Sequence, residues 1–180
     1  MSITRTGPAF GMPVWLLDVD GVLNAARPGW DVSPDQARAV VDGVSYRLRW
    51  AQPMVDRVRA MATGGAVEVR WATTWVDHIA QIEASLGLPR LPTAFSGLGS
   101  HLAKAATQKL DAALHTVEVE RRPLIWTDDD AIPEHGPMLD RLRRAGVPVL
   151  LLSPRTGIGL QPEDLDDIDA FLDELAVRVG

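Results

Sequence analysis

Two patterns of apolar residues occur in turn along this chain, one typical of strands and one typical of helices. Short runs that are apolar at successive positions are typical of buried strands, and they occur at 14–17, 123–127 and 147–152; residues 67–72 are the next strand candidate. Longer segments carry apolar residues at helical spacing, and they predict helices that begin at Pro53 and near Pro162 and helices that span 76–86, 101–115 and 136–144. Residues 91–95 are a further candidate for a short strand.

The alternation of strands with helices predicts the fold class. It indicates an α/β fold with a doubly wound, mostly parallel sheet that helices cover on both faces. Open sheets of this kind bind their ligands at the carboxyl ends of the strands. Residues 24–52 interrupt the alternation: they contain several Pro and Gly residues, and 44–50 alternates between apolar and polar side chains. This segment predicts a small β-hairpin or flap.

The composition is that of a folded globular domain. The chain has 180 residues, which favours one domain over 1–180. Hydrophobic residues make up 46% and charged residues 23%, which excludes wholesale disorder. The sequence has no cysteine, so it has no disulfide and no thiolate zinc site.

The charge balance is acidic, with 18 basic and 24 acidic residues and a net charge of −6. Domains that bind nucleic acid without sequence preference usually carry a basic excess, so any nucleic-acid contact here would be local and ligand-specific. The apolar run 14–17 lies between Pro13 and Asp18 and is too short for a signal peptide or a membrane span. We expect a soluble cytoplasmic protein without membrane association, and the sequence indicates no protein partner.

Polar side chains follow three of the expected strands, at the point where each strand ends. They are Asp18 and Asp20, Thr73 and Thr74, and Asp128 and Asp129. Because the carboxyl ends of parallel strands meet at one edge of a sheet, we expect these side chains to converge. Such hard oxygen ligands suit Mg²⁺, which usually keeps some waters and a substrate phosphate.

Each part of this pattern has an ordinary structural explanation when taken alone. An Asp-Gly pair after a strand is most often a turn, and a Thr there is usually a hydrogen-bonded turn residue. An acidic run is more often a solvated loop or a helix N-terminus. Their joint occurrence, each after an apolar strand, favours a functional site.

The first of these segments carries a family resemblance. Residues 17–24, Leu-Asp-Val-Asp-Gly-Val-Leu-Asn, resemble the first motif of the haloacid dehalogenase (HAD) superfamily. Residues 72–75 are similar to its second motif, a strand that ends in Thr or Ser, and 124–129 resemble its acidic fourth motif. The Lys of the third motif corresponds to Lys109, with Lys104 as the substitute.

Finer details are similar to one bacterial branch of this superfamily, the HAD domain associated with multi-enzyme RNA-repair proteins. They lie at 71–75, 122–126 and 159–160. The resemblance implies a HAD-like Rossmannoid fold and a Mg²⁺-dependent phosphatase that hydrolyses a phosphate monoester through an aspartyl-phosphate intermediate. Asp18 would be the nucleophile, and Asp20 the general acid and then the general base. Dehalogenase members lack an acid at the position of Asp20, which favours phosphoryl chemistry.

The resemblance also implies a set of binding residues. Mg²⁺ would be held by Asp18, by the backbone carbonyl of Asp20 and by an acid of the pair Asp128 and Asp129, of which the motif favours Asp129. The phosphoryl oxygens would be held by a hydroxyl and an ammonium group. The candidates for these two groups are Thr73, in competition with Thr74, and Lys109, in competition with Lys104.

The length of 24–52 leaves room for a flap but not for a folded cap domain. An open, essentially capless site suits a phosphorylated substrate that is a small molecule or a nucleic-acid end. The aromatic residues Trp30, Tyr46 and Trp50 either stack on a base or cover the underside of the flap. Arg47, Arg49 and Arg155 are candidates for contacts with a substrate anion. The alternative function is a catalytically inert HAD-like binding or regulatory module.

Overall fold

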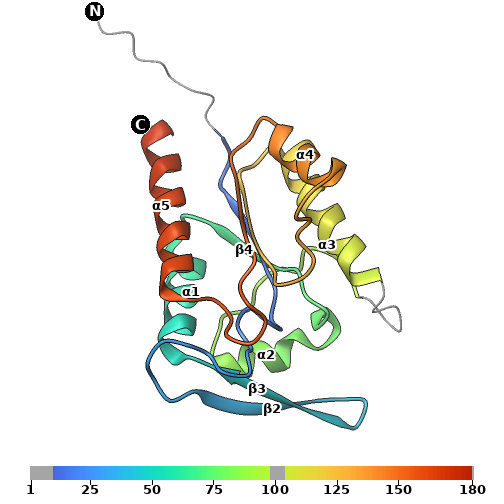
Figure 1. The fold of residues 1–180 in the computed structure, drawn as a ribbon, viewed down its shortest axis with the longest axis vertical. Coiled ribbons are helices and arrows are strands. Elements are labelled where there is room, and N and C mark those ends of the chain that lie inside the picture. The colour runs from blue at the N-terminus through green and yellow to red at the C-terminus, as the bar shows by residue number, and fades with distance from the viewer. Residues whose placement is uncertain (1–9, 98–103, 180) are drawn as a thin grey trace, which may run out of the picture.

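The computed structural model of the chain describes residues 10–97 and 104–179 (Figure 1). Its centre is a four-stranded sheet with the order β4-β1-β5-β6, in which every neighbouring pair is parallel. The strands are β1 (Val14–Leu17), β4 (Glu68–Trp71), β5 (Leu124–Thr127) and β6 (Val149–Leu152). The expected parallel sheet of an α/β protein is confirmed, and the arrangement is compatible with a Rossmann-like fold.

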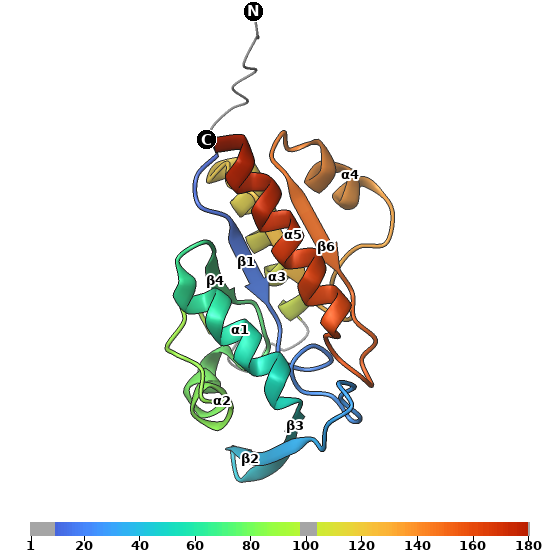
Figure 2. The ribbon, with the colours of Figure 1, turned by 90° about the vertical axis from the view of Figure 1, so that its left-hand side faces the viewer.

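Helices cover both faces of the sheet (Figures 1 and 2). On one face lie α1 (Gln52–Gly64) and α5 (Pro162–Val179), and on the other lie α3 (Ala105–Leu114) and α4 (Pro137–Arg144). A short turn η1 (Val76–His78) precedes α2 (Ile79–Leu86), and α3 continues into one π-helical turn, η3 (His115–Val119). The first residues of the helix expected at 101–115 lie outside the described residues.

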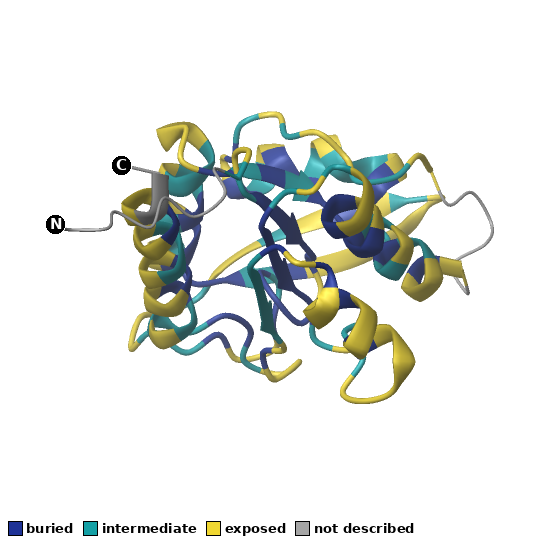
Figure 3. Cartoon of the chain, turned by 90° about the horizontal axis from the view of Figure 1, so that it is seen from above, coloured by how far each residue is buried: buried dark blue, intermediate teal, exposed yellow. Residues whose placement is uncertain are grey.

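The central strands β1 and β5 are buried along their whole length, and β1 is apolar on both faces. Trp15 and Leu17 of β1 belong to one core with α1 and α5, and Val14 and Leu16 belong to a second core with α3 and α4. All four side chains are fully buried. Figure 3 shows the buried residues gathered in the strands and on the inner sides of the helices. Within 10–97 and 104–179, no helix is both long and apolar enough to cross a membrane.

The expected flap is a β-hairpin of β2 (Asp35–Val41) and β3 (Val44–Trp50), which lies beyond the carboxyl end of β1 (Figure 2). The turn at Asp42 and Gly43 has positive φ at both residues. Gln81 of α2 holds the outer edge of the hairpin, since its side chain accepts from the backbone N–H of Val40 and donates to the Val40 carbonyl, both at 3.0 Å. The flap is therefore tied to α2.

The expectation of a strand at 91–95 is wrong in extent. This segment forms one parallel bridge, between Thr93 and Trp71 at the edge of β4. The bridge has two hydrogen bonds of 2.8 Å, from the Trp71 N–H to the Pro92 carbonyl and from the Ala94 N–H to the Trp71 carbonyl. Pro92 has no N–H to extend the ladder, so the pairing ends after one residue.

Candidate functional site

The carboxyl ends of three neighbouring strands bring three predicted residues together. Asp18 follows β1, Asp128 follows β5 and Thr73 lies just beyond β4, and all three side chains are buried. Strand pairing continues up to the site, because the Asp18 N–H donates to the Thr127 carbonyl at 3.2 Å and the Ala72 N–H donates to the Leu17 carbonyl at 2.9 Å. The regular sheet therefore positions this end of the site.

Lys109 reaches the same point from α3. Its Nζ lies 2.6 Å from Oδ2 of Asp18 and 2.8 Å from Oδ2 of Asp128. Only 4% of this lysine is exposed. A lysine is almost never buried unless it is paired. Lys109 thus serves as the shared counter-ion of two buried carboxylates.

The cluster holds more carboxyl groups than ammonium groups. Burial raises the pKa of Asp18 to about 7; Asp128 adds to the rise, while Lys109 and the hydrogen bond with Thr73 oppose it. Burial disfavours the charge of Lys109, but the two carboxylates outweigh it and raise the lysine pKa to about 12. Lys109 therefore stays charged at neutral pH, and one ammonium group faces more than one carboxylate.

A third carboxylate completes a group that fits a divalent cation. One oxygen from each of Asp18, Asp128 and Asp129 lies within 4.8 Å of the others. Asp128 is held by the N–H groups of Asp130 and Ala131, which donate to its Oδ1 at 3.1 and 2.8 Å. Its buried Oδ2 is ion-paired with Lys109 but accepts no well-directed hydrogen bond. That oxygen keeps a lone pair available, and an all-oxygen donor set suits Mg²⁺.

Gly21 allows Asp129 to approach the loop after β1. Gly21 has a φ of +70°, and a Cβ added there would lie 2.2 Å from the carboxylate carbon of Asp129. Any side chain at this position would displace the Asp129 carboxylate. The motif favoured Asp129 as the metal ligand, whereas the structure brings both Asp128 and Asp129 to the cluster.

Asp20 lies at the mouth of the site rather than in the buried cluster. Its Oδ1 accepts from Nδ2 of Asn24 at 2.7 Å, and its Oδ2 accepts from Nε1 of Trp75 at 2.8 Å. Oδ1 of Asn24 in turn accepts from the backbone N–H of Arg49 at 2.8 Å. The Asp20 carboxylate is therefore oriented by one donor on each oxygen, and one of these donors is tied to the hairpin.

The sequence analysis assigned no role in the site to Asn24 or to Trp75. Trp75 follows β4, in the turn before η1, and its ring meets Tyr46 of the flap edge-on at 5.5 Å between centroids. For Asn24, the only signal was its position in the first motif. Both roles depend on loop conformation, which residue periodicity does not report.

The other candidates lie away from the cluster. Thr74 is half-buried and lines a small cleft of about 160 Å³ with Asp20 and Trp75. Lys104 is exposed at the start of α3. The structure thus brings Thr73 and Lys109 to Asp18, rather than their competitors.

Two of the aromatic candidates anchor the flap to the rest of the chain. Nε1 of Trp30 donates to the Leu160 carbonyl at 2.8 Å, and Nε1 of Trp50 donates to Oε1 of Gln52 at 3.0 Å. Trp50 is also buried. Both residues therefore cover the underside of the flap, which is one of the two interpretations of the sequence.

Comparisons of the chain with protein-family models, with curated proteins and with solved structures found no match.

Proposed function

We propose that the protein is a Mg²⁺-dependent phosphatase of the HAD type, which hydrolyses a phosphate monoester through an aspartyl-phosphate intermediate. The observation that carries this proposal is the buried cluster of Asp18, Asp128 and Asp129, with Lys109 at 2.6 Å from Asp18. The resemblance of 17–24 and 124–129 to HAD motifs supports it, as does a sheet with helices on both faces. The proposal includes a doubly wound, essentially capless HAD-like fold with the β2–β3 hairpin as its flap.

The carboxylates of Asp18, Asp128 and Asp129 would hold Mg²⁺. When bound, the ion supplies positive charge that reduces the repulsion between an anionic nucleophile and an anionic phosphate. Two observations fit this role: Oδ2 of Asp128 accepts no well-directed hydrogen bond, and the cluster holds more carboxyl groups than ammonium groups.

In the first step, an oxygen of Asp18 attacks phosphorus. A bond forms between this oxygen and phosphorus, and the bond between phosphorus and the ester oxygen breaks. Asp20 gives its proton to the departing oxygen, which leaves as an alcohol. The hydrogen bonds from Asn24 and Trp75 orient the Asp20 carboxyl for this transfer.

In the second step, water attacks the phosphoryl group on Asp18. Asp20 takes a proton from the water, the new phosphorus–oxygen bond forms, and the bond to Asp18 breaks. Inorganic phosphate leaves, and both aspartates return to their initial states. Lys109 and the hydroxyl of Thr73 lie beside Asp18, where they can stabilise the charge that develops on the phosphoryl oxygens.

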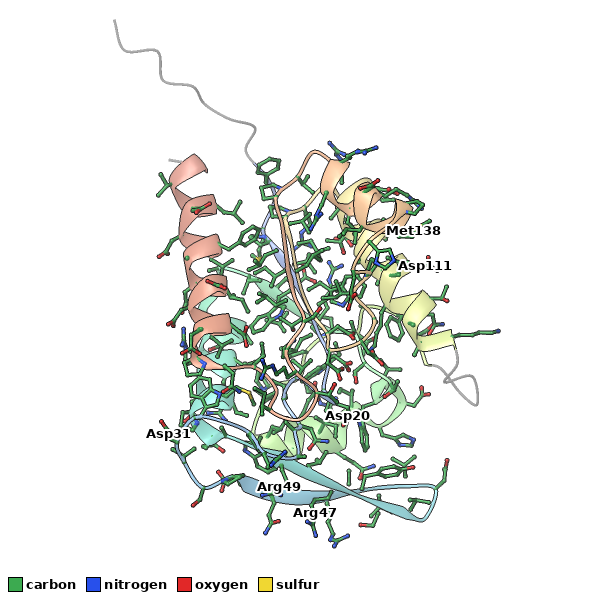
Figure 4. All side chains as sticks on the ribbon, viewed as in Figure 1. Asp20, Asp31, Arg47, Arg49, Asp111 and Met138 are labelled. Carbon is green, nitrogen blue, oxygen red and sulfur yellow. The ribbon has the colours of Figure 1, made fainter. Side chains whose placement is uncertain are left out.

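The test is phosphate release from a panel of esters, in Mg²⁺ and in EDTA. The panel contains small alkyl and aryl phosphates and oligonucleotides with 3′- or 5′-phosphates. We expect turnover that requires Mg²⁺ and that Asp18→Asn removes. Asp111→Asn is the matched control, because Asp111 is exposed on α3, well away from Asp20 in Figure 4. Turnover by Asp18→Asn at the rate of the unmodified protein would contradict the proposal.

A further inference from the structure

A second cleft opens beside Asp20, and the aspartates of the buried cluster do not line it. It has a volume of about 450 Å³ and lies between β3, the loop 20–26 and the loop at 156–157. Asp20 and Gly21 line one part of it, and Arg47 and Arg49 of the hairpin line another. Figure 4 shows both arginines on the flap beyond Asp20.

The two arginines share one face of β3. They are two positions apart in a strand, so their side chains leave the same side about 7 Å apart, while Leu48 between them is buried on the opposite side. The backbone of Arg49 is fixed, because its N–H donates to Oδ1 of Asn24 at 2.8 Å and its carbonyl accepts from the Ala25 N–H at 3.0 Å. The cleft wall is therefore held at a constant position beside Asp20.

These arginines lack acidic partners. Within 10–97 and 104–179, no carboxylate forms an ion pair with Arg47 or Arg49, although Arg57, Arg70 and Arg141 each have one. The oxygens of Asp20, which also lines the cleft, already accept from Asn24 and Trp75. 

Arg38 of β2 lies directly opposite Arg47 in the hairpin, but it does not line the cleft, and its Nη1 donates to Oγ of Ser45 at 3.1 Å. Two arginines without acidic partners at one cleft, in a chain with a net charge of −6, are typical of an anion site.

We propose that this cleft, which we call the arginine cleft, binds a second anionic group of the substrate while the ester to be cleaved lies at Asp18. The inference rests on the phosphatase activity proposed above. The second group is a phosphate or a phosphodiester. The planar guanidinium groups of Arg47 and Arg49 can each donate two parallel hydrogen bonds to two oxygens of such a group. Gly21 lies between the buried cluster and the arginine cleft, since it approaches Asp129 of the cluster and also lines the cleft.

The test compares substrates that differ only in the second anion. They are an alkyl monophosphate, the bisphosphate of the same carbon skeleton, and a phosphorylated dinucleotide with one phosphodiester. We expect kcat/KM to be at least about 10-fold higher for one of the last two, since hydrogen bonds between charged groups contribute on that scale. A preference for the bisphosphate identifies a small substrate, and a preference for the dinucleotide identifies a nucleic-acid end. No preference for either would overturn the proposal.

Substitutions test whether the preference for a second anionic group arises in the arginine cleft. We expect Arg49→Gln and Arg47→Gln to reduce the preference about 10-fold, measured as the ratio of the two kcat/KM values. Arg38→Gln is the matched control, since it removes the same charge from the same hairpin but lies outside the cleft lining. A ratio that is unchanged in Arg47→Gln and Arg49→Gln, or that falls equally in Arg38→Gln, would overturn the proposal.

A binding measurement separates this inference from the proposed activity. Without a metal ion, the carboxylates at Asp18 repel inorganic phosphate, so calorimetry with phosphate in EDTA reports the arginine cleft alone. We expect binding that weakens about 10-fold in Arg49→Gln and persists in Arg38→Gln, even if no ester is hydrolysed. Absence of binding, or equal binding by all variants, would overturn the proposed cleft whether or not the phosphatase activity is found.

Discussion

Nζ of Lys109 lies 2.6 Å from Oδ2 of Asp18, although the two residues are 91 positions apart in the chain. The contact joins α3 to the carboxyl end of β1, and the second ion pair of Lys109, with Asp128, extends the link to β5. One buried ammonium group therefore connects three elements of the fold and neutralises part of the site's negative charge. The contact should therefore affect both the stability of the fold and the proposed binding of Mg²⁺.

Removing the ammonium group should destabilise the metal-free protein. We expect Lys109→Met to lower the free energy of unfolding in EDTA by about 3 kcal/mol, because it leaves buried carboxylates without their partner. Mg²⁺ should restore part of this loss, since the proposed site would bind it through the same carboxylates in the folded state. Urea denaturation with and without Mg²⁺ measures both effects.

The control for this variant is Lys104→Met, which makes the same change at an exposed position of the same helix. We expect it to change the free energy of unfolding by less than about 0.5 kcal/mol. Equal losses in the two variants would show that the buried ion pairs of Lys109 do not stabilise the fold.

A side chain at position 21 should weaken metal binding. Gly21→Ala places a methyl group against the Asp129 carboxylate, so we expect the affinity for Mg²⁺ to fall about 10-fold or more. Gly43→Ala is the matched control, because Gly43 also has a positive φ, of +79°, but no atom lies within 4 Å of an added Cβ. Calorimetric titration with Mg²⁺ tests the pair, and an unchanged affinity in Gly21→Ala would exclude Asp129 as a ligand.

An ion-pair network outside the site should make stability depend on pH. Arg70 lies 2.6 Å from Glu120 and 2.8 Å from Glu68, and Arg122 pairs with both acids. The hydrogen bonds from Arg70 lower the pKa of Glu120 and of Glu68 below the usual value of 4.5, although burial opposes the shift. A depressed folded-state pKa contributes stability above pH 4.5, which is lost as the pH falls through the folded-state value.

We therefore expect Glu120→Gln to be about 1 kcal/mol less stable than the unmodified protein at pH 7, with a difference that shrinks as the pH falls below 4.5. Glu134→Gln is the control at an exposed position, and its difference should not vary in this way. Thermal unfolding from pH 3 to pH 7 measures both. A difference for Glu120→Gln that stays constant over this range would contradict the linkage.

Strand ends account for the part of the site that the sequence predicted well. Asp18, Thr73 and Asp128 each follow a strand of the parallel sheet, and neighbouring parallel strands end at the same edge, so their convergence depends only on the sheet. The choice between Lys109 and Lys104 depends instead on how α3 is rotated against the sheet. That rotation is set by the packing of buried residues such as Ala113 and Leu114, which the spacing of one helix does not reveal.

Loop conformation accounts for what the sequence did not predict. The hydrogen bond between Asn24 and Asp20 closes a tight turn, and this turn needs the positive φ of Gly21. The bond from Trp75 to Asp20 joins residues 55 positions apart in two different loops. Such contacts arise only once the strands and the hairpin have been placed in space, and hydrophobic patterns carry no information about them.

The role of Asp20 predicts a dependence on the leaving group. Proton transfer by a positioned group contributes roughly 10²- to 10⁴-fold, and an aryl phosphate needs little protonation of its leaving group. We therefore expect Asp20→Asn to slow alkyl phosphates far more than aryl phosphates, with little change in Mg²⁺ affinity. Equal losses on both esters, together with a large fall in Mg²⁺ affinity, would identify Asp20 as a side-chain metal ligand instead.

The proposed mechanism is tested most directly by detection of a phosphoryl group on Asp18. In Asp20→Asn, an aryl phosphate should still transfer its phosphoryl group, but no base activates the water that removes it, so the intermediate should accumulate. Mass spectrometry of rapidly quenched Asp20→Asn protein should then show one added phosphoryl group on the peptide that contains Asp18, and none when Asp18→Asn is combined with it. A phosphoryl group on a different residue, or release of the aryl alcohol without any phosphorylated peptide, would contradict the account.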